Sequence, residues 1–190
     1  MKSINKNHYL GIGLIAFAVI FRVFSVEMSW HNVAPLVGIS LLSGFLFKRS
    51  ALAFLIPLAI YFGSDLYLQL TSGAGFYGVS QYFVYGAMAL VALLGTFMKK
   101  NKPLSVAGFA LSGTLLFWII SNFGVFAAGF YGYSFAGLVQ TYLMAIPFYT
   151  PMGTELFVNA IVGDLIFTSM IFATYSVITS KVMQLKVDRA

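Results

Sequence analysis

Long apolar segments alternate with short polar turns along the whole chain. Six of these segments are predicted to form helices, at residues 9–25, 33–47, 51–70, 78–98, 104–128 and 153–179. A helix of about 20 residues is long enough to cross the hydrocarbon core of a bilayer, which is about 30 Å thick. The pattern therefore predicts one all-α transmembrane domain, residues 1–190, with six membrane-spanning helices.

Basic residues occur only at every second turn, apart from Arg22, which lies inside the first apolar segment. The four basic patches are Lys2 and Lys6; Lys48 and Arg49; Lys99, Lys100 and Lys102; and Lys181, Lys186 and Arg189. Basic loops stay on the cytoplasmic side of a membrane, so we expect both termini to be cytoplasmic. The net charge of +6 then reflects topology and attraction to anionic lipid, and nucleic acid is not an expected partner.

Residues 129–152 are apolar and aromatic but are interrupted by glycine, proline and polar residues. If this segment crossed the membrane, the last helix would reverse and the C-terminal basic patch would lie outside. The charge pattern opposes that, so we interpret the segment as an outer lid or a short re-entrant helix. Its many aromatic rings fit an interfacial belt, with a flat ring-shaped ligand as the alternative. The apolar start of the chain resembles a signal peptide, but it leads into Arg22 and not into a small-residue cleavage site, so we expect it to remain as a helix.

Polar side chains inside the predicted helices are the candidate functional residues. At about 1.5 Å of rise per residue, Arg22, Asp65, Asn122 and Asn159 fall at a similar height in the outer third, whereas Asp164 lies nearer the midplane. An ionisable group at the bilayer centre costs on the order of 2.5–3.5 kcal/mol, so such groups face the bundle interior and find partners.

Two interpretations of this polar cluster remain open. In the first, Arg22 and Asp65 neutralise each other and only stabilise helix packing. In the second, the cluster forms the floor of an outward-facing substrate pocket that Gln140 and Tyr142 of the lid segment help to close. In either case Asp164 is a candidate proton carrier.

Other chemistries are excluded or disfavoured by the sequence. The chain has no Cys, and His8 and His31 lack further ligands at metal-binding spacing, so no metal site is expected. Signatures of zinc proteases, serine hydrolases and phosphate-binding loops are missing. Asp65 and Asp164 do not fit an intramembrane aspartyl protease, because their predicted heights and flanking residues differ from that pattern. We therefore expect neither an enzyme nor a bound cofactor.

Ordered motifs along the chain resemble a bacterial family of uncharacterised small membrane proteins. They include Asn32-x-x-Pro35, Ser64-Asp65-Leu66, Ser121-Asn122-Phe123-Gly124-Val125, Ala145-Ile146-Pro147-Phe148 and Gly163-Asp164-Leu165. That family is similar in size and helix layout to the S components of energy-coupling-factor vitamin transporters. The resemblance implies an outward-facing vitamin pocket, a partner coupling subunit with ATPases, and location in the bacterial cytoplasmic (inner) membrane. The first helix lacks the Ala-x-x-x-Ala face that many S components use for docking.

Three functions follow from these observations. The first is a solute-binding membrane subunit for uptake of a vitamin-like or cofactor-precursor molecule. The second is a self-sufficient transporter coupled to protons or ions through Asp65 or Asp164. The third is a structural or assembly protein that transports nothing.

Overall fold

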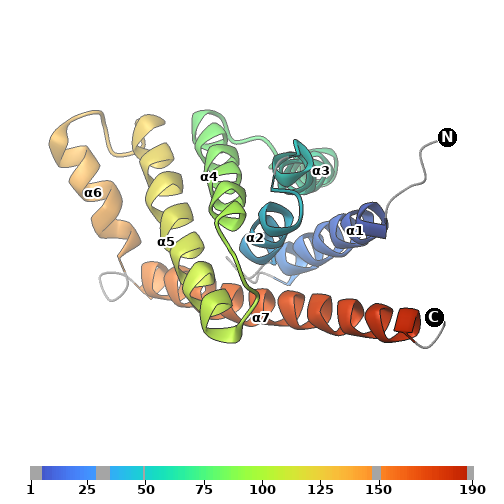
Figure 1. Cartoon of the computed structure of the whole chain (residues 1–190). Helices are drawn as coiled ribbons and strands as arrows, with labels where there is room; N and C mark the ends of the chain where they lie inside the picture. The colour runs from blue at the N-terminus through green and yellow to red at the C-terminus, as the bar shows by residue number, and fades with distance from the viewer. Residues whose placement is uncertain (1–5, 29–34, 49, 147–150, 188–190) are drawn as a thin grey trace.

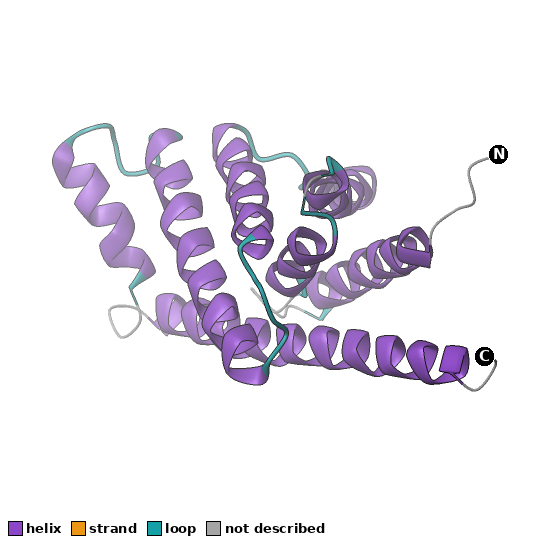
Figure 2. Cartoon of the chain, viewed as in Figure 1, coloured by secondary structure: helices purple, strands orange, loops and turns teal. Residues whose placement is uncertain are grey.

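The computed structural model describes residues 6–28, 35–48, 50–146 and 151–187, and these residues form seven helices and no strand (Figures 1 and 2). The helices are α1 (Lys6–Glu27), α2 (Leu36–Leu46), α3 (Leu52–Ser72), α4 (Val79–Thr96), α5 (Pro103–Ala127), α6 (Phe135–Ala145) and α7 (Pro151–Val187). The predicted all-α class is confirmed for this part of the chain. His31 and Asn32, with the end of the predicted lid at residues 147–150, lie outside the described residues.

Local signals explain where several helices begin and end. Pro103 occupies the first turn of α5, where its missing N–H costs nothing. Ser134 caps α6 by accepting a hydrogen bond from the backbone N–H of Gly137 at 3.1 Å. Gly73 ends α3 in the left-handed conformation, with φ of 69°, a conformation that glycine adopts without steric cost. These caps position the turns on which the site depends.

Helix α2 lies at the centre of the molecule and contacts α1, α3, α4, α5 and α7. Every residue from Leu36 to Gly44 is buried. At about 1.5 Å per residue its 11 residues extend for only about 16 Å, roughly half the thickness of a bilayer core. Helix α2 is therefore mainly the packing core around which the longer helices assemble.

Among the described residues, four helices are long and apolar enough to cross a membrane: Leu52–Ser72, Val79–Thr96, Pro103–Ala127 and Phe157–Ser180. The segments Ala16–Ser25, Leu36–Leu46 and Phe135–Ala145 are shorter apolar helices. Large hydrophobic side chains are exposed on the long helices, as expected of surfaces that face lipid. The membrane-type character of the fold is thus supported by four helices, while the number of six crossings stays a prediction.

Helix α7 packs against α6, α5 and α2 and ends on the right of the view in Figure 1, on the side where α1 begins. At one end of the bundle, Lys48 Nζ donates a hydrogen bond to the Met98 carbonyl at 2.7 Å. In the same turn between α4 and α5, Asn101 donates to Ser176 Oγ of α7 at 2.8 Å. These two contacts bring the basic residue that follows α2 and the turn containing Lys99 to one end of the molecule.

Candidate functional site

The buried carboxylate of Asp65 on α3 is bonded by three side chains from two other helices. Arg22 on α1 forms an ion pair with it, with 2.6 Å between Arg22 Nη2 and Asp65 Oδ1. Gln81 Nε2 and the Tyr85 hydroxyl, both on α4, donate to Oδ2 at 2.8 Å each. Asp65 is only 1% exposed, so its charge depends on these three donors in place of water.

The same network holds the turn between α3 and α4. Gln81 Nε2 lies 3.2 Å from the Gly75 carbonyl, and the Gln69 side-chain oxygen accepts from the backbone N–H groups of Gly75 and Phe76. Two glutamine side chains therefore fasten the 73–78 turn to the end of the bundle where Asp65 lies. Tyr77 belongs to this turn, and its position depends on the network.

Arg22 also connects the ion pair to an aromatic wall. Its guanidinium carbon lies 3.9 Å from the centre of the Tyr61 ring, a cation–π geometry. The Tyr61 ring in turn meets the Tyr85 ring edge-on at 5.7 Å. Among the described residues, Arg22 Nη1 has no hydrogen-bond partner, so this guanidinium is held mainly by Asp65 and Tyr61.

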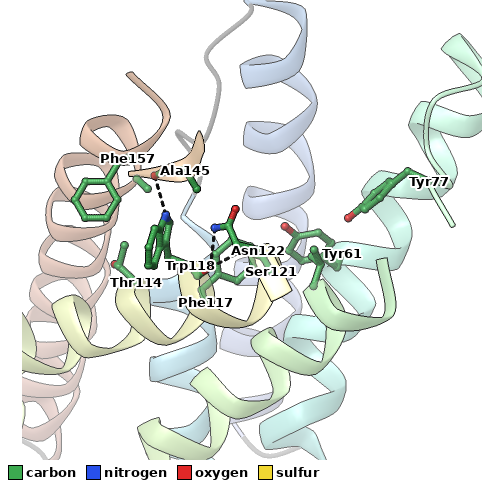
Figure 3. A pocket seen from close by; sticks show the side chains of 11 residues that line it. Tyr61, Tyr77, Thr114, Phe117, Trp118, Ser121, Asn122, Ala145 and Phe157 are labelled. Atoms are coloured by element: carbon green, nitrogen blue, oxygen red, sulfur yellow. Dashed lines mark hydrogen bonds between the residues drawn. The ribbon is translucent and has the colours of Figure 1, made fainter. Parts of the chain in front are cut away.

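A pocket of about 280 Å³ opens on the other side of Tyr61 (Figure 3). Its lining residues come from five helices and the turn between α3 and α4: Tyr61, Tyr77, Val84, Thr114, Phe117, Trp118, Ser121, Asn122, Ala145, Phe157 and Ala160. Trp118, Ser121 and Asn122 on α5 face Tyr61 and Tyr77 across the space (Figure 3). None of these lining side chains is an acid or a base at neutral pH, so the pocket presents rings, hydroxyls and one amide.

Hydrogen bonds fix the aromatic and polar groups of the pocket. Trp118 Nε1 donates to the Ala145 carbonyl at 3.2 Å, which fastens the end of α6 to α5. Asn122 Nδ2 donates to the Trp118 carbonyl at 2.8 Å, which leaves its Oδ1 as an acceptor for a ligand. Burial raises the pKa of the Tyr77 phenol above its ordinary value of 10.0, so this hydroxyl is neutral over the physiological range.

A second buried carboxylate lies behind the pocket wall. Asp164 on α7 is 7% exposed, and its Oδ2 is 2.7 Å from the hydroxyl of Thr114. Thr114 lines the pocket, so a single side chain separates Asp164 from that space. Arg22, the cation that lies within the first apolar segment, is already paired with Asp65.

The structure brings some of the predicted site residues together and separates others. Arg22 and Asp65 are in direct contact, as the first interpretation expects, but neither lines the pocket. Asn122 lines it, and Asn159 is half-buried on α7 beside the lining residue Ala160. The two predicted lid residues, Gln140 and Tyr142, are on α6; Gln140 is exposed, and the Tyr142 hydroxyl donates to the Ile119 carbonyl at 2.8 Å.

Several residues that form this site were not predicted from the sequence, chiefly Tyr61, Gln81 and Tyr85. Helical spacing contains a signal for them, because Tyr61 and Asp65 are four residues apart, as are Gln81 and Tyr85, so each pair shares a helix face. A search for polar residues four positions from each intramembrane charge would have selected Tyr61, but neither Gln81 nor Tyr85. The pairing of the two faces depends on tertiary packing and has no local signal.

Thr168 provides a test of the packing around Asp164. Its hydroxyl is fully buried and has no hydrogen-bond partner among the described residues. A buried polar group without a partner costs about 1–3 kcal/mol. We expect Thr168→Val, which keeps the shape and removes the hydroxyl, to raise the melting temperature in detergent. A lower melting temperature would mean that the hydroxyl has a partner, such as a bound water.

In the part of the chain that the structure describes, seven helices, four of them long and apolar enough to cross a bilayer, define an all-helical protein of membrane type with a small pocket inside the bundle. Residues 2–185 match the model of the Family of unknown function (DUF6580), and the chain belongs to this family. No curated protein matches the chain, and no solved structure matches it.

Proposed function

We propose that the protein binds a small, uncharged, ring-shaped solute in the pocket between α3, α5 and α7 and serves as the solute-binding membrane subunit for its uptake. The observation that supports this most is the pocket lining. Aromatic side chains offer stacking surfaces, and the Asn122 amide with the Ser121 and Tyr77 hydroxyls offers neutral hydrogen-bonding groups. Because the nearby charges are paired or lie behind the wall, a charged solute would find no counter-charge there.

The volume limits the size of the solute. Ligand pockets commonly measure about 300–1,000 Å³, so a space of about 280 Å³ suits a compact molecule of one or two rings. A vitamin-like molecule or a cofactor precursor is of this size class. Trp118, held in place through the Ala145 carbonyl, is suited to stack against such a ring.

The position of the pocket supports an outward-facing site. Tyr77 lies in the turn between α3 and α4, whereas the turn that contains Lys99 lies at the opposite ends of α4 and α5. If basic turns are cytoplasmic, the pocket opens on the far side, with both termini inside and α6 as part of an outer lid. This topology, with six crossings in a bacterial cytoplasmic membrane, is part of the proposal.

Uptake needs an energy source, and the chain has no nucleotide-binding motif. A transmembrane coupling subunit with ATPases, as the likeness to S components implies, would supply it. A self-sufficient proton-coupled transporter is a second candidate, which the buried Asp164 beside the pocket favours. In a purely structural protein, by contrast, replacing pocket residues would affect stability alone.

The proposal is tested by thermal stability of the full chain in mild detergent against a panel of vitamins and ring-containing precursors. A ligand at 100 times its Kd stabilises by about 2.7 kcal/mol, enough to raise the melting temperature measurably. We expect one compound class to do so, and Asn122→Ala to weaken its binding about tenfold by removing a polar anchor. Ser112→Ala, at an exposed position of the same helix, is the control and should bind normally. A panel without any stabilising compound would reject the proposal.

A further inference from the structure

The hydroxyl of Thr114 lies within hydrogen-bond distance of two acceptors but has a single proton to donate. Its Oγ1 is 2.7 Å from Asp164 Oδ2 and 3.0 Å from the Ala110 carbonyl of its own helix. An ionised carboxylate only accepts hydrogen bonds, whereas a protonated carboxyl also donates one. The direction of the bond between Thr114 and Asp164 therefore depends on whether Asp164 bears a proton.

Among the described residues, no charged side chain from the helices packed against α7 compensates Asp164. The described residues of α2 and α5 include no ionisable side chain. On α6 the ionisable group is Tyr142, which is bonded to the Ile119 carbonyl. Helix α1 reaches α7 through the contact of Phe21 with Phe167, but its Arg22 is paired with Asp65.

The remaining ionisable groups nearby are tyrosines. Tyr61 on α3 faces Arg22 and the pocket, and Tyr175 is on α7 itself, eleven residues beyond Asp164. A buried carboxylate inside a membrane-spanning segment needs a cation or a proton to offset its burial. Since no cation side chain is in place among the described residues, a proton is the simplest partner.

We propose that Asp164 is a proton-binding site whose occupancy is transmitted to the solute pocket through the Thr114 hydroxyl. In the acid form, Asp164 donates to Thr114 Oγ1, and Thr114 donates to the Ala110 carbonyl. When the proton leaves to solvent, the Thr114 hydroxyl turns and donates to the carboxylate. Because Thr114 lines the pocket, this reversal changes which of its lone pairs a bound solute meets.

This arrangement couples proton binding to solute binding, with one proton for each pocket. A solute that donates a hydrogen bond to Thr114 Oγ1 favours the form in which Asp164 is ionised, because in the acid form the Asp164 proton already occupies one of the two lone pairs of that oxygen. A solute that would accept a hydrogen bond from Thr114 favours neither the acid nor the ionised form of Asp164. The Thr114 proton is donated to the Ala110 carbonyl in the first form and to the carboxylate in the second. The inference rests on the proposed function for the solute, while the proton site can be tested without any solute.

Infrared difference spectroscopy of the full chain in lipid nanodiscs, recorded as the pH is raised, tests the proton site. We expect a protonated-carboxyl C=O band that disappears with rising pH, is absent from Asp164→Asn and changes frequency in Thr114→Val. Thr168→Val, which removes another buried hydroxyl one turn along α7, should leave the band unchanged. A titrating carboxyl band that persists in Asp164→Asn overturns the proposal. If Asp164→Asn does not fold, Thr114→Val is the deciding variant, and a band of unchanged frequency in that variant overturns the proposal.

Coupling to the pocket is tested with Trp118 as the probe, in a Trp30→Phe background that leaves one tryptophan. Its fluorescence should change along the same pH curve as the carboxyl band, and Asp164→Asn should abolish the change. Trp118 emission that does not change with pH overturns the coupling. Emission that responds to Na⁺ at constant pH overturns the assignment of a proton, because Asp164 would then bind a metal cation. A failed solute panel with an intact titration would reject the proposed function alone.

Discussion

Asp65→Ala is expected to destabilise the protein by about 3–5 kcal/mol, because it removes one partner of a buried ion pair and leaves the other charge without compensation. Arg22 would retain only the ring of Tyr61, and Gln81 and Tyr85 would each lose an acceptor at 2.8 Å. The decrease in melting temperature in detergent measures this effect, and the size-exclusion profile is recorded as a second readout.

Two further variants show whether the charge is the cause. Tyr85→Phe removes one hydrogen bond to the carboxylate and should cost less, about 1.5–3 kcal/mol. The double variant Arg22→Leu with Asp65→Leu replaces both charges by apolar groups, and we expect it to recover much of the loss. The matching single variants are Arg22→Leu and Asp65→Leu. If the double variant loses as much stability as the sum of these two losses, the ion pair itself is not what the site depends on.

Gly95→Ala should also destabilise the protein strongly, because α2 and α4 pack through glycine. A Cβ at Gly95 would meet the backbone of Leu41 on α2, and one at Gly44 would meet the Ala92 carbonyl on α4. Backbone cannot move aside as a flexible side chain can, so the two helices must separate. Overpacking of this kind costs about 1–3 kcal/mol, and here it displaces the central helix of the fold.

Gly86→Ala is the matched control, since Gly86 lies in the same helix and a Cβ there meets nothing within 4 Å. Alanine at an open helical position reduces the entropy of the unfolded chain and is expected to stabilise by about 0.4–1 kcal/mol. The two variants should therefore shift the melting temperature in opposite directions. Equal shifts would contradict the close approach of α2 and α4.

The helical class could be read from the sequence because apolar runs between basic patches have few other solutions in a membrane. The partnership of Arg22 with Asp65 was also foreseeable, since both charges are placed at one height by helix geometry and each needs a partner. Helix α2 was expected as one of six spans; its central position among five other helices depends on glycine contacts that no local pattern specifies.

The site was less predictable than the fold. The estimated depth along the membrane normal placed Asn122 at the height of Arg22 and Asp65. A depth estimate contains no information on which side of each helix faces the pocket. The rotation of α3 places Tyr61 between Arg22 and the pocket, so the ion pair lies behind an aromatic wall. The rotation of α3 is set by its packing against α1, α2 and α4, which only the three-dimensional structure supplies.

Native mass spectrometry of the protein, extracted from a bacterial membrane in mild detergent, tests the central claim most directly. We expect a compact, uncharged ring-containing molecule to be retained by the protein, to be lost from Trp118→Ala and to be kept by Ser112→Ala. A retained molecule that is charged, or one that remains bound after Trp118→Ala, would contradict the assignment of this pocket as the solute-binding site.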